Sequence, residues 1–193
     1  MNMAGIDSKQ QAILTSAWAA FSAYGFRKTS MDDIAKGAGV SRPALYLHFK
    51  NKEAIFRALV QVYYGAALAD VRAALAGEGT LVERLEAAFA AQGGEAMEAM
   101  LSSPHGLELF EAGMSVAAEE ISAGEEGLRD IYARWLEDEA CEGRAVLSSS
   151  AEEIAAAFCA AMKGVKHTAS GFPAYRSGVR QLARLFGAGL TPK

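Results

Sequence analysis

Apolar residues recur every three or four positions along almost the whole chain, and no segment alternates with a period of two. The first such pattern begins at the predicted N-cap Ser8 and ends at Gly25. Its apolar face consists of Ile13, Leu14, Ala17, Trp18, Phe21 and Tyr24. Because a strand with one buried face requires alternation, this periodicity predicts an all-α fold.

Capping residues, prolines and glycines divide the pattern into further helices. Short helices are predicted after Ser30 and after Ser41, and a long helix over residues 51–75. Further helices are expected at 80–91 and 95–101, with a break at Gly93 and Gly94, and then at 102–120, 128–143, 148–168 and 172–187. The polar segment 122–126 is predicted to be a connection.

The composition is that of an ordinary globular protein, with 51% hydrophobic and 22% charged residues in 193. No basic N-terminal cluster leads into an apolar run, and no stretch of 18 or more uncharged apolar residues follows. We therefore expect a cytoplasmic protein that does not interact with a membrane.

Charge is distributed unevenly along the chain. Residues 1–60 contain eight Lys/Arg against four Asp/Glu, a net charge of +4, whereas the remaining 133 residues contain 11 against 19, a net charge of −8. A basic N-terminal segment joined to an acidic body favours contact with phosphates at one end only.

The segment after the first helix meets three requirements of a helix-turn-helix at fixed offsets. Ala35 is small where two helices would cross, Gly39 supplies a turn four residues later, and Leu45 reaches the core six residues further on. An ordinary pair of packed helices also needs a small residue and a turn glycine, so the polar face of the third helix is the additional observation. With Leu45 and Phe49 buried, this face presents Ser41, Arg42, Ala44, Tyr46 and His48, and Lys50 and Lys52 follow.

The stretch from Thr29 to Glu53, TSMDDIAKGAGVSRPALYLHFKNKE, resembles the DNA-binding signature of the tetracycline-repressor (TetR) family. The preceding FSAYGF at 21–26 is similar to the end of that family's first helix. The resemblance implies that the third helix reads the major groove and that a homodimer binds a pseudo-palindromic operator in double-stranded DNA. The residues expected to contact DNA are Thr29, Ser30, Ser41, Arg42, Ala44, Tyr46, His48, Lys50 and Lys52. Leu47 departs from the family, which more often has a small or polar residue there.

The same resemblance divides the chain into a DNA-binding domain at 1–52, with a connecting helix from about 51, and a helical effector-binding and dimerisation domain at 53–193. In the family the last two helices form a four-helix dimer interface, which matches residues 155–168 and 174–185 here. The interface residues expected are Ala157, Phe158, Ala161, Val179, Leu182 and Phe186. An intramolecular core is the alternative for these residues.

Methionines and aromatic residues of the acidic body are candidates to line a pocket for a small apolar or aromatic effector. They are Tyr63, Phe89, Met97, Met100, Phe110, Met114, Trp135 and Met162. Membership of the hydrophobic core is the alternative for each. By resemblance, an effector would act through the helix over 51–75 and release a repressor from its operator.

An enzyme is not expected, because the three histidines and two cysteines are isolated and the chain has no GxSxG, HExxH or phosphate-binding loop. We accordingly predict no catalytic residues, no metal site and no cofactor. A helical adaptor without specific DNA binding remains the alternative function, and it predicts no salt-dependent binding to DNA.

Overall fold

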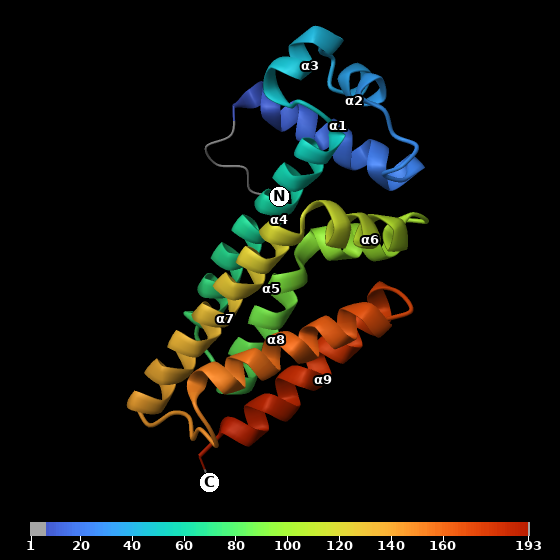
Figure 1. Ribbon diagram of the computed structural model, residues 1–193. Coiled ribbons are helices and arrows are strands. Elements are labelled where there is room, and N and C mark those ends of the chain that lie inside the picture. Colours follow the sequence, from blue (N-terminus) through green and yellow to red (C-terminus); the bar gives the residue numbers. More distant parts are fainter. Residues whose placement is uncertain (1–6, 193) are drawn as a thin grey trace. The chain divides into compact units, whose positions relative to one another are not determined.

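The computed structural model describes residues 7–192, and every regular element in this range is a helix (Figure 1). The helices are α1 (Ser8–Tyr24), α2 (Met31–Gly37), α3 (Arg42–His48), α4 (Lys52–Leu75), α5 (Leu81–Ser102), α6 (Gly106–Val116), α7 (Ala118–Cys141), α8 (Ala151–Thr168) and α9 (Phe172–Leu190). The predicted all-α class is confirmed in this range.

The chain divides into two compact units. The first comprises the residues up to Ala66 together with Glu95–Ser122, and the second comprises Ala67–Gly94 together with Ala123–Lys193. Helices α4, α5 and α7 therefore contribute to both units. The predicted domain boundary lies at residue 52, and residues 1–6 of the predicted first domain lie outside the described range. The first compact unit is larger than that domain because α6 also packs into it.

The first unit is built around one hydrophobic core. Phe21 of α1, Phe26 of the following loop and Phe56 of α4 form an aromatic triangle with ring centroids 5.2–5.7 Å apart. Ile34 of α2 and Leu45 of α3 are fully buried in the same core. Helix α6 adds Leu109 and Ala112, and α4 adds Ile55 and Leu59. Burial of these side chains from five helices fixes the helix-turn-helix on its support.

The second unit contains an aromatic cluster and a packed pair of helices, α8 and α9 (Figure 1). The rings of Phe89, Tyr132 and Phe158 meet edge to face at 5.4–5.7 Å, and Phe186 lies 4.6 Å from Phe158. Phe158 and Val179 are buried within this unit. Their assignment to a dimer interface is therefore corrected, because their side chains already pack inside one chain.

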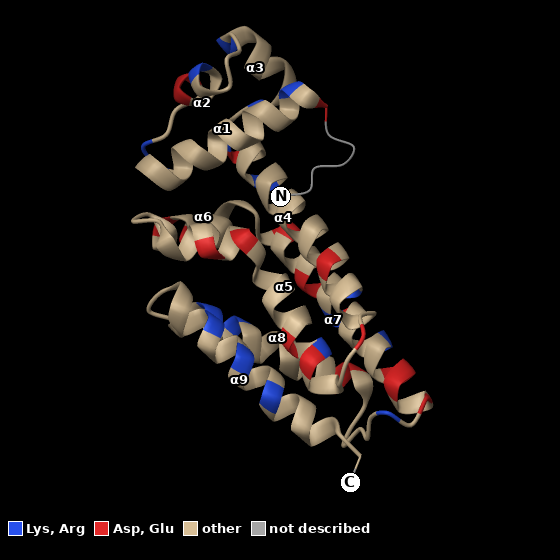
Figure 2. Cartoon of the chain, turned by 180° about the vertical axis from the view of Figure 1, so that it is seen from behind, with Lys and Arg blue, Asp and Glu red and all other residues tan. Residues whose placement is uncertain are grey.

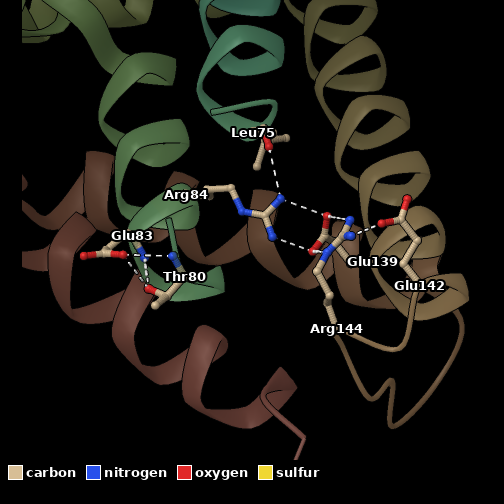
Figure 3. A network of polar contacts seen from close by, with 7 residues as sticks. All are labelled: Leu75, Thr80, Glu83, Arg84, Glu139, Glu142 and Arg144. Carbon is tan, nitrogen blue, oxygen red and sulfur yellow. Dashed lines mark hydrogen bonds and ion pairs between the residues drawn. The ribbon is translucent and has the colours of Figure 1, made fainter. Parts of the chain in front are cut away.

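A network of charged side chains joins the ends of three helices in the second unit (Figure 3). The carboxylate of Glu139 accepts hydrogen bonds from Arg144 at 2.7 Å and from Arg84 at 2.8 Å. Arg84 also donates to the carbonyl of Leu75, the last residue of α4, and its guanidinium lies 5.5 Å from the ring centroid of Trp135. Arg144 forms a second ion pair with Glu142. Because both Glu139 oxygens are used, the buried charge is fully paired.

This pairing changes the titration of Glu139. The hydrogen bonds from Arg144, together with the hydrogen bonds and charge of Arg84, outweigh the effect of burial and lower the pKa of Glu139 to about 2. The carboxylate is therefore ionised throughout the physiological range. No sequence pattern indicated this network.

Two backbone features bear on the predicted helix boundaries. Gly94 interrupts α5 with φ 55° and ψ −164°, which confirms the break expected at Gly93 and Gly94. The connection predicted at 122–126 is wrong, because α7 runs through it without interruption. Alanine and glutamate favour helix, so the polarity of this segment indicated exposure and not the end of a helix.

Helix α4 is long and apolar enough to cross a membrane by length and composition alone. It nevertheless contains Asp70 and Arg72, and it buries Ile55 and Leu59 in the first unit and Val71 in the second. We interpret α4 as a core helix.

Candidate nucleic-acid interface

The two helices of the helix-turn-helix begin at side-chain caps. Ser30 accepts a hydrogen bond from the backbone of Asp33, and Asp33 accepts one from the backbone of Ser30, which forms a complete capping box for α2. Ser41 accepts from the backbone N–H of Ala44, and Pro43 lies in the first turn of α3. Short helices of seven residues depend on such caps, because they have few internal hydrogen bonds.

The predicted helix-turn-helix offsets agree with the structure. Ala35 is buried where α2 packs on α1, Gly39 has φ +67°, and Leu45 is fully buried. A left-handed backbone at position 39 is strained for a residue with a side chain, so glycine suits this turn. Ser16 of α1 also donates a hydrogen bond of 2.8 Å to the carbonyl of Ile34, which fixes α2 on α1.

The exposed face of α3 carries a charged and aromatic pair. Tyr46 is 43% exposed, and the guanidinium of Arg42 lies 5.7 Å from its ring centroid. Arg42 also donates to Asp32 of α2 at 3.2 Å. The side-chain contact with Tyr46 and the charge of Asp32 raise the pKa of Arg42, so this group is always cationic. A planar cation beside an exposed phenol is suited to base edges and phosphates.

The remaining predicted residues on α3 are placed as follows. Ser41 is exposed, and Ala44 and His48 are half-buried. The ring nitrogen Nδ1 of His48 lies 3.8 Å from the carboxylate of Asp7. Leu47, where the sequence departs from the family pattern, is 86% exposed at the surface of α3. Ser30 is exposed at the start of α2, and its hydroxyl donates to Asp33 at 2.6 Å.

Thr29 and Lys52, both predicted to contact DNA, form hydrogen bonds within the chain. Thr29 is only 2% exposed, and its hydroxyl donates to the carbonyl of Gly25 at 2.7 Å. The ammonium of Lys52 donates to the carbonyls of Phe26, Arg27 and Thr29 at 2.9, 3.0 and 3.2 Å. Both side chains therefore stabilise the loop between α1 and α2, a role that the prediction of DNA contacts did not include.

Several other cations of the first sixty residues are exposed. They are Lys9, Arg27, Lys28, Lys36 and Lys50. Helix α2 carries both signs of charge, with Lys36 beside Asp32 and Asp33, as the blue and red segments of Figure 2 show. Helix α6 has red but no blue segments in the same figure, because its charged residues are glutamates. Positive charge in the first unit is thus concentrated around the helix-turn-helix, where it can attract phosphates.

This segment matches a known family. Residues 13–59 match the model described as bacterial regulatory proteins, tetR family. This segment of the chain is therefore similar to the DNA-binding segment of tetR-family regulators. The matched residues extend from the core of α1 to Leu59 of α4, and so include the whole helix-turn-helix.

Curated relatives share the same part of this chain. It is 43% identical to the HTH-type transcriptional regulator EthR of Mycolicibacterium smegmatis over 54 residues, which cover 28% of this chain and 25% of that protein. It is 35% identical to the HTH-type transcriptional activator FasR of the same organism over 85 residues, covering 44% and 39%. RutR of Escherichia coli is 37% identical over 68 residues, covering 35% and 32%. The alignments thus span a quarter to two fifths of the relatives' length.

Solved structures extend the likeness of fold to almost the whole chain. SmeT, described as the repressor of the Stenotrophomonas maltophilia multidrug efflux pump SmeDEF, superposes with a TM-score of 0.73 at 21% identity, covering 95% of this chain and 91% of that one. The reduced form of Escherichia coli NemR gives a TM-score of 0.70 at 18% identity, covering 91% and 96%. The chain therefore has the fold of these proteins.

The residues predicted to line an effector pocket are divided between the two units. Tyr63, Met97, Met100, Phe110 and Met114 belong to the first, and Phe89, Trp135 and Met162 to the second. Met97, Phe89 and Met162 are buried in their cores, whereas Met114 is exposed. Over residues 7–192, no group of three or more His, Cys, Asp and Glu residues is arranged to hold a metal ion.

The helices predicted to form a dimer interface keep an exposed face. Ala157 of α8 and Leu185 of α9 are exposed, the latter by 70%, and Ala161, Leu182 and Phe186 are half-buried. Leu185 was not predicted, although its position three residues after Leu182 places both on one face of α9 and could have indicated it.

Proposed function

We propose that the protein is a cytoplasmic, sequence-specific DNA-binding regulator that represses transcription and leaves its operator when a small-molecule effector binds. The observation that carries this proposal is the capped α3, which exposes Arg42 and Tyr46 in the segment that matches the tetR family. A catalytic role has no comparable support in the side chains of this site.

The proposed contacts fall into two chemical classes. Lys50 and the exposed cations around it would neutralise phosphates and strengthen binding to any sequence. Tyr46 and Arg42 would contact base edges in the major groove, with Ser30, Ser41, Ala44 and His48 at the margins of the same surface. Such a division predicts an affinity that falls with salt and a specificity that depends on α3.

A homodimer would place two copies of α3 on one duplex. Exposed Ala157 and half-buried Ala161 permit close approach of two α8 helices, and Leu185, Leu182 and Phe186 supply apolar area on α9. Because such an interface is two-fold symmetric, the operator would be a pseudo-palindrome with half-site centres roughly 34–36 Å apart, one turn of DNA.

An effector is proposed by analogy with structural neighbours. One of them is described as a SmeT–triclosan complex, at 22% identity and a TM-score of 0.72. Triclosan is a small aromatic compound, and aromatic or methionine side chains suit such ligands. Met100, Phe110, Met114 and Tyr63 in the first unit, or Trp135 in the second, would contact an effector of this class. Trp135 is itself buried, so it would contribute, like Met97, Phe89 and Met162, only if the effector reached the cores.

Selection of bound sequences from a random DNA pool tests the main proposal. Wild type should enrich a palindrome, and its affinity for that duplex should fall steeply with salt. Tyr46→Ala should weaken binding to the palindrome by about 1–3 kcal/mol, while binding to unrelated DNA stays unchanged. Leu47→Ala, at an exposed neighbouring position of α3, is the matched control.

The alternative function, a helical adaptor, predicts the opposite result. Wild type would then enrich no sequence, and its weak binding would not depend on salt. A promoter carrying the selected operator, fused to a reporter gene, separates repression from activation, since FasR shows that a relative of this chain is described as an activator.

A further inference from the structure

The loop between α1 and α2, residues 25–30, is held by two charged side chains from other helices. From α4, Lys52 donates to three loop carbonyls and lies 4.8 Å from the ring centroid of Phe26. From α6, Glu108 accepts a hydrogen bond of 2.8 Å from the backbone N–H of Arg27. The loop thus has a cation bound to its carbonyls and an anion bound to its amide.

These contacts connect directly to the helix-turn-helix. One of the three carbonyls bound by Lys52 is that of Thr29, and the next residue, Ser30, is the N-cap of α2. The Thr29 hydroxyl closes the loop on Gly25. Residues 26–29 lead directly into α2, so their position sets where α2 begins. Only a short turn separates α2 from α3. A displacement of this loop would move the exposed face of α3.

The ammonium group of Lys52 already donates its hydrogen bonds within the chain. An ammonium has three N–H donors, and all three find carbonyl acceptors within 3.2 Å. Contact with a phosphate would require at least one of these bonds to break. Lys50, two residues earlier, is exposed and makes a suitable phosphate contact instead.

Helix α6 is fastened to the same region by a second contact. Ser103, three residues before α6, donates to the carbonyl of Ser22 in α1 at 2.8 Å. His105 lies with Nδ1 3.5 Å from the carboxylate of Glu108 and so flanks the group that receives the Arg27 amide. The acidic side chain of Glu108 therefore lies at the helix-turn-helix support although its net charge opposes DNA.

We propose that Lys52 and Glu108 are positioning residues for DNA recognition: they hold the α1–α2 loop so that α3 is presented in a binding-competent orientation, and neither side chain contacts DNA. This inference rests on the proposed function. It differs from an electrostatic role in a measurable way, because a positioning residue affects the operator and not unrelated DNA, whereas a phosphate contact affects both.

The experiment measures affinity for the selected operator and for unrelated duplex over a range of salt concentrations, in the full chain. Lys52→Met should weaken operator binding at least tenfold, with the wild-type salt slope and wild-type affinity for unrelated DNA. Lys52→Arg, which keeps the charge but replaces the compact ammonium, should lose operator affinity as well. Lys50→Met is the control and should lower the salt slope by about 0.9 on both duplexes.

For Glu108→Ala, a positioning role and a purely electrostatic role predict opposite changes in affinity for the operator. Removing a negative charge would strengthen binding to every duplex if electrostatics alone mattered, but loss of the Arg27 contact should weaken operator binding. Glu111→Ala, at an exposed position of the same helix, is the matched control. Circular dichroism checks that each variant is folded. If Lys52→Met does not fold, Lys52→Arg is the variant used for the test.

Three outcomes are distinguishable. Operator-specific losses in the Lys52 and Glu108 variants support the inference. A reduced salt slope in Lys52→Met together with wild-type binding by Lys52→Arg would overturn it and make Lys52 a phosphate contact. If wild type selects no operator at all, the proposed function fails, and a loop displaced in Lys52→Met would no longer bear on DNA.

Discussion

Arg42 of α3 donates a hydrogen bond to Asp32 of α2 at 3.2 Å, so a base-reading candidate is paired within the chain before DNA is present. Both side chains are more than half exposed. An exposed pair of this kind contributes about 0–1 kcal/mol to stability. Breaking the contact between Arg42 and Asp32 therefore costs little free energy, but Asp32 would compete with a DNA phosphate for the guanidinium of Arg42.

Asp32→Ala should consequently increase affinity for DNA of any sequence. Loss of the carboxylate removes repulsion and frees Arg42, so the salt slope should become steeper by about one. Binding titrations at several salt concentrations measure this. In Arg42→Ala the same Asp32 change should have a smaller effect, and equal effects in both backgrounds would show that the pair is not coupled.

Glu139 should make stability depend on pH in an acidic window. Its pKa is about 2 in the folded protein against 4.5 ordinarily, so the unfolded chain binds a proton first as pH falls. The stabilisation is present above pH 4.5 and is lost between there and about pH 2, on the order of 3 kcal/mol.

Glu139→Gln should therefore lower the free energy of unfolding by about 3–5 kcal/mol at pH 7, since it leaves two arginines without their anion. Urea unfolding at pH 7, 4 and 3 should show that the gap to wild type narrows as pH falls. Glu142→Gln, which removes an exposed partner of Arg144, should change stability by less than about 1 kcal/mol. A difference in stability between wild type and Glu139→Gln that does not change with pH would contradict the lowered pKa of Glu139.

Gly94 and Gly65 should respond in opposite directions to the same substitution. At φ 55° and ψ −164°, Gly94 adopts a backbone that costs other residues about 1–3 kcal/mol, although a Cβ there would meet nothing within 4 Å. Gly65 lies inside α4 with equal free space, so Gly65→Ala should stabilise by about 0.5–1 kcal/mol. Thermal denaturation of both variants tests the pair, and stabilisation by Gly94→Ala would refute the strained backbone.

Leu185→Asp should weaken the proposed dimer. Burying this exposed leucine would contribute about 1.5–3 kcal/mol, and a carboxylate at the interface would lose its hydration without a partner. Sedimentation equilibrium should show a dissociation constant at least tenfold higher. Leu107→Asp, at a 75% exposed leucine of α6, should leave the assembly unchanged. An unaltered dimer in Leu185→Asp would place the interface elsewhere.

Local features of this chain could be predicted because their causes are local. Ser30 and Ser41 cap helices through hydrogen bonds to residues three positions away, and both were identified from the sequence. Asp7 caps α1 instead of the predicted Ser8, since both are good caps and adjacent in sequence. The offsets of Ala35, Gly39 and Leu45 are likewise local.

Contacts between distant residues could not be predicted in the same way. Lys52 reaches carbonyls 23 to 26 positions earlier, and Glu108 reaches an amide 81 positions earlier, so no periodicity links them. Lys52 was expected to contact DNA from its charge and from the family resemblance, but a lysine stem is long enough to carry its ammonium to carbonyls of the chain itself. For Thr29 a local signal existed: a β-branched hydroxyl four residues after Gly25 can bond back to its carbonyl.

Burial of residues on α8 and α9 also depends on contacts with distant parts of the chain. Helical spacing identified Phe158 and Val179 as apolar, and one helix face can serve the core or a partner. Only the aromatic neighbours Phe89 and Tyr132, contributed by α5 and α7, decide that Phe158 is internal.

The division of the chain also separates its two tryptophans. Trp18 packs against the core of the first unit, and Trp135 lies buried in the second beneath the guanidinium of Arg84. Each unit therefore carries a single tryptophan, whose indole can be excited at wavelengths that tyrosine does not absorb. Replacing one indole with phenylalanine leaves a chain whose emission reports on one half alone, so the cooperativity between the two halves can be followed optically without adding a label.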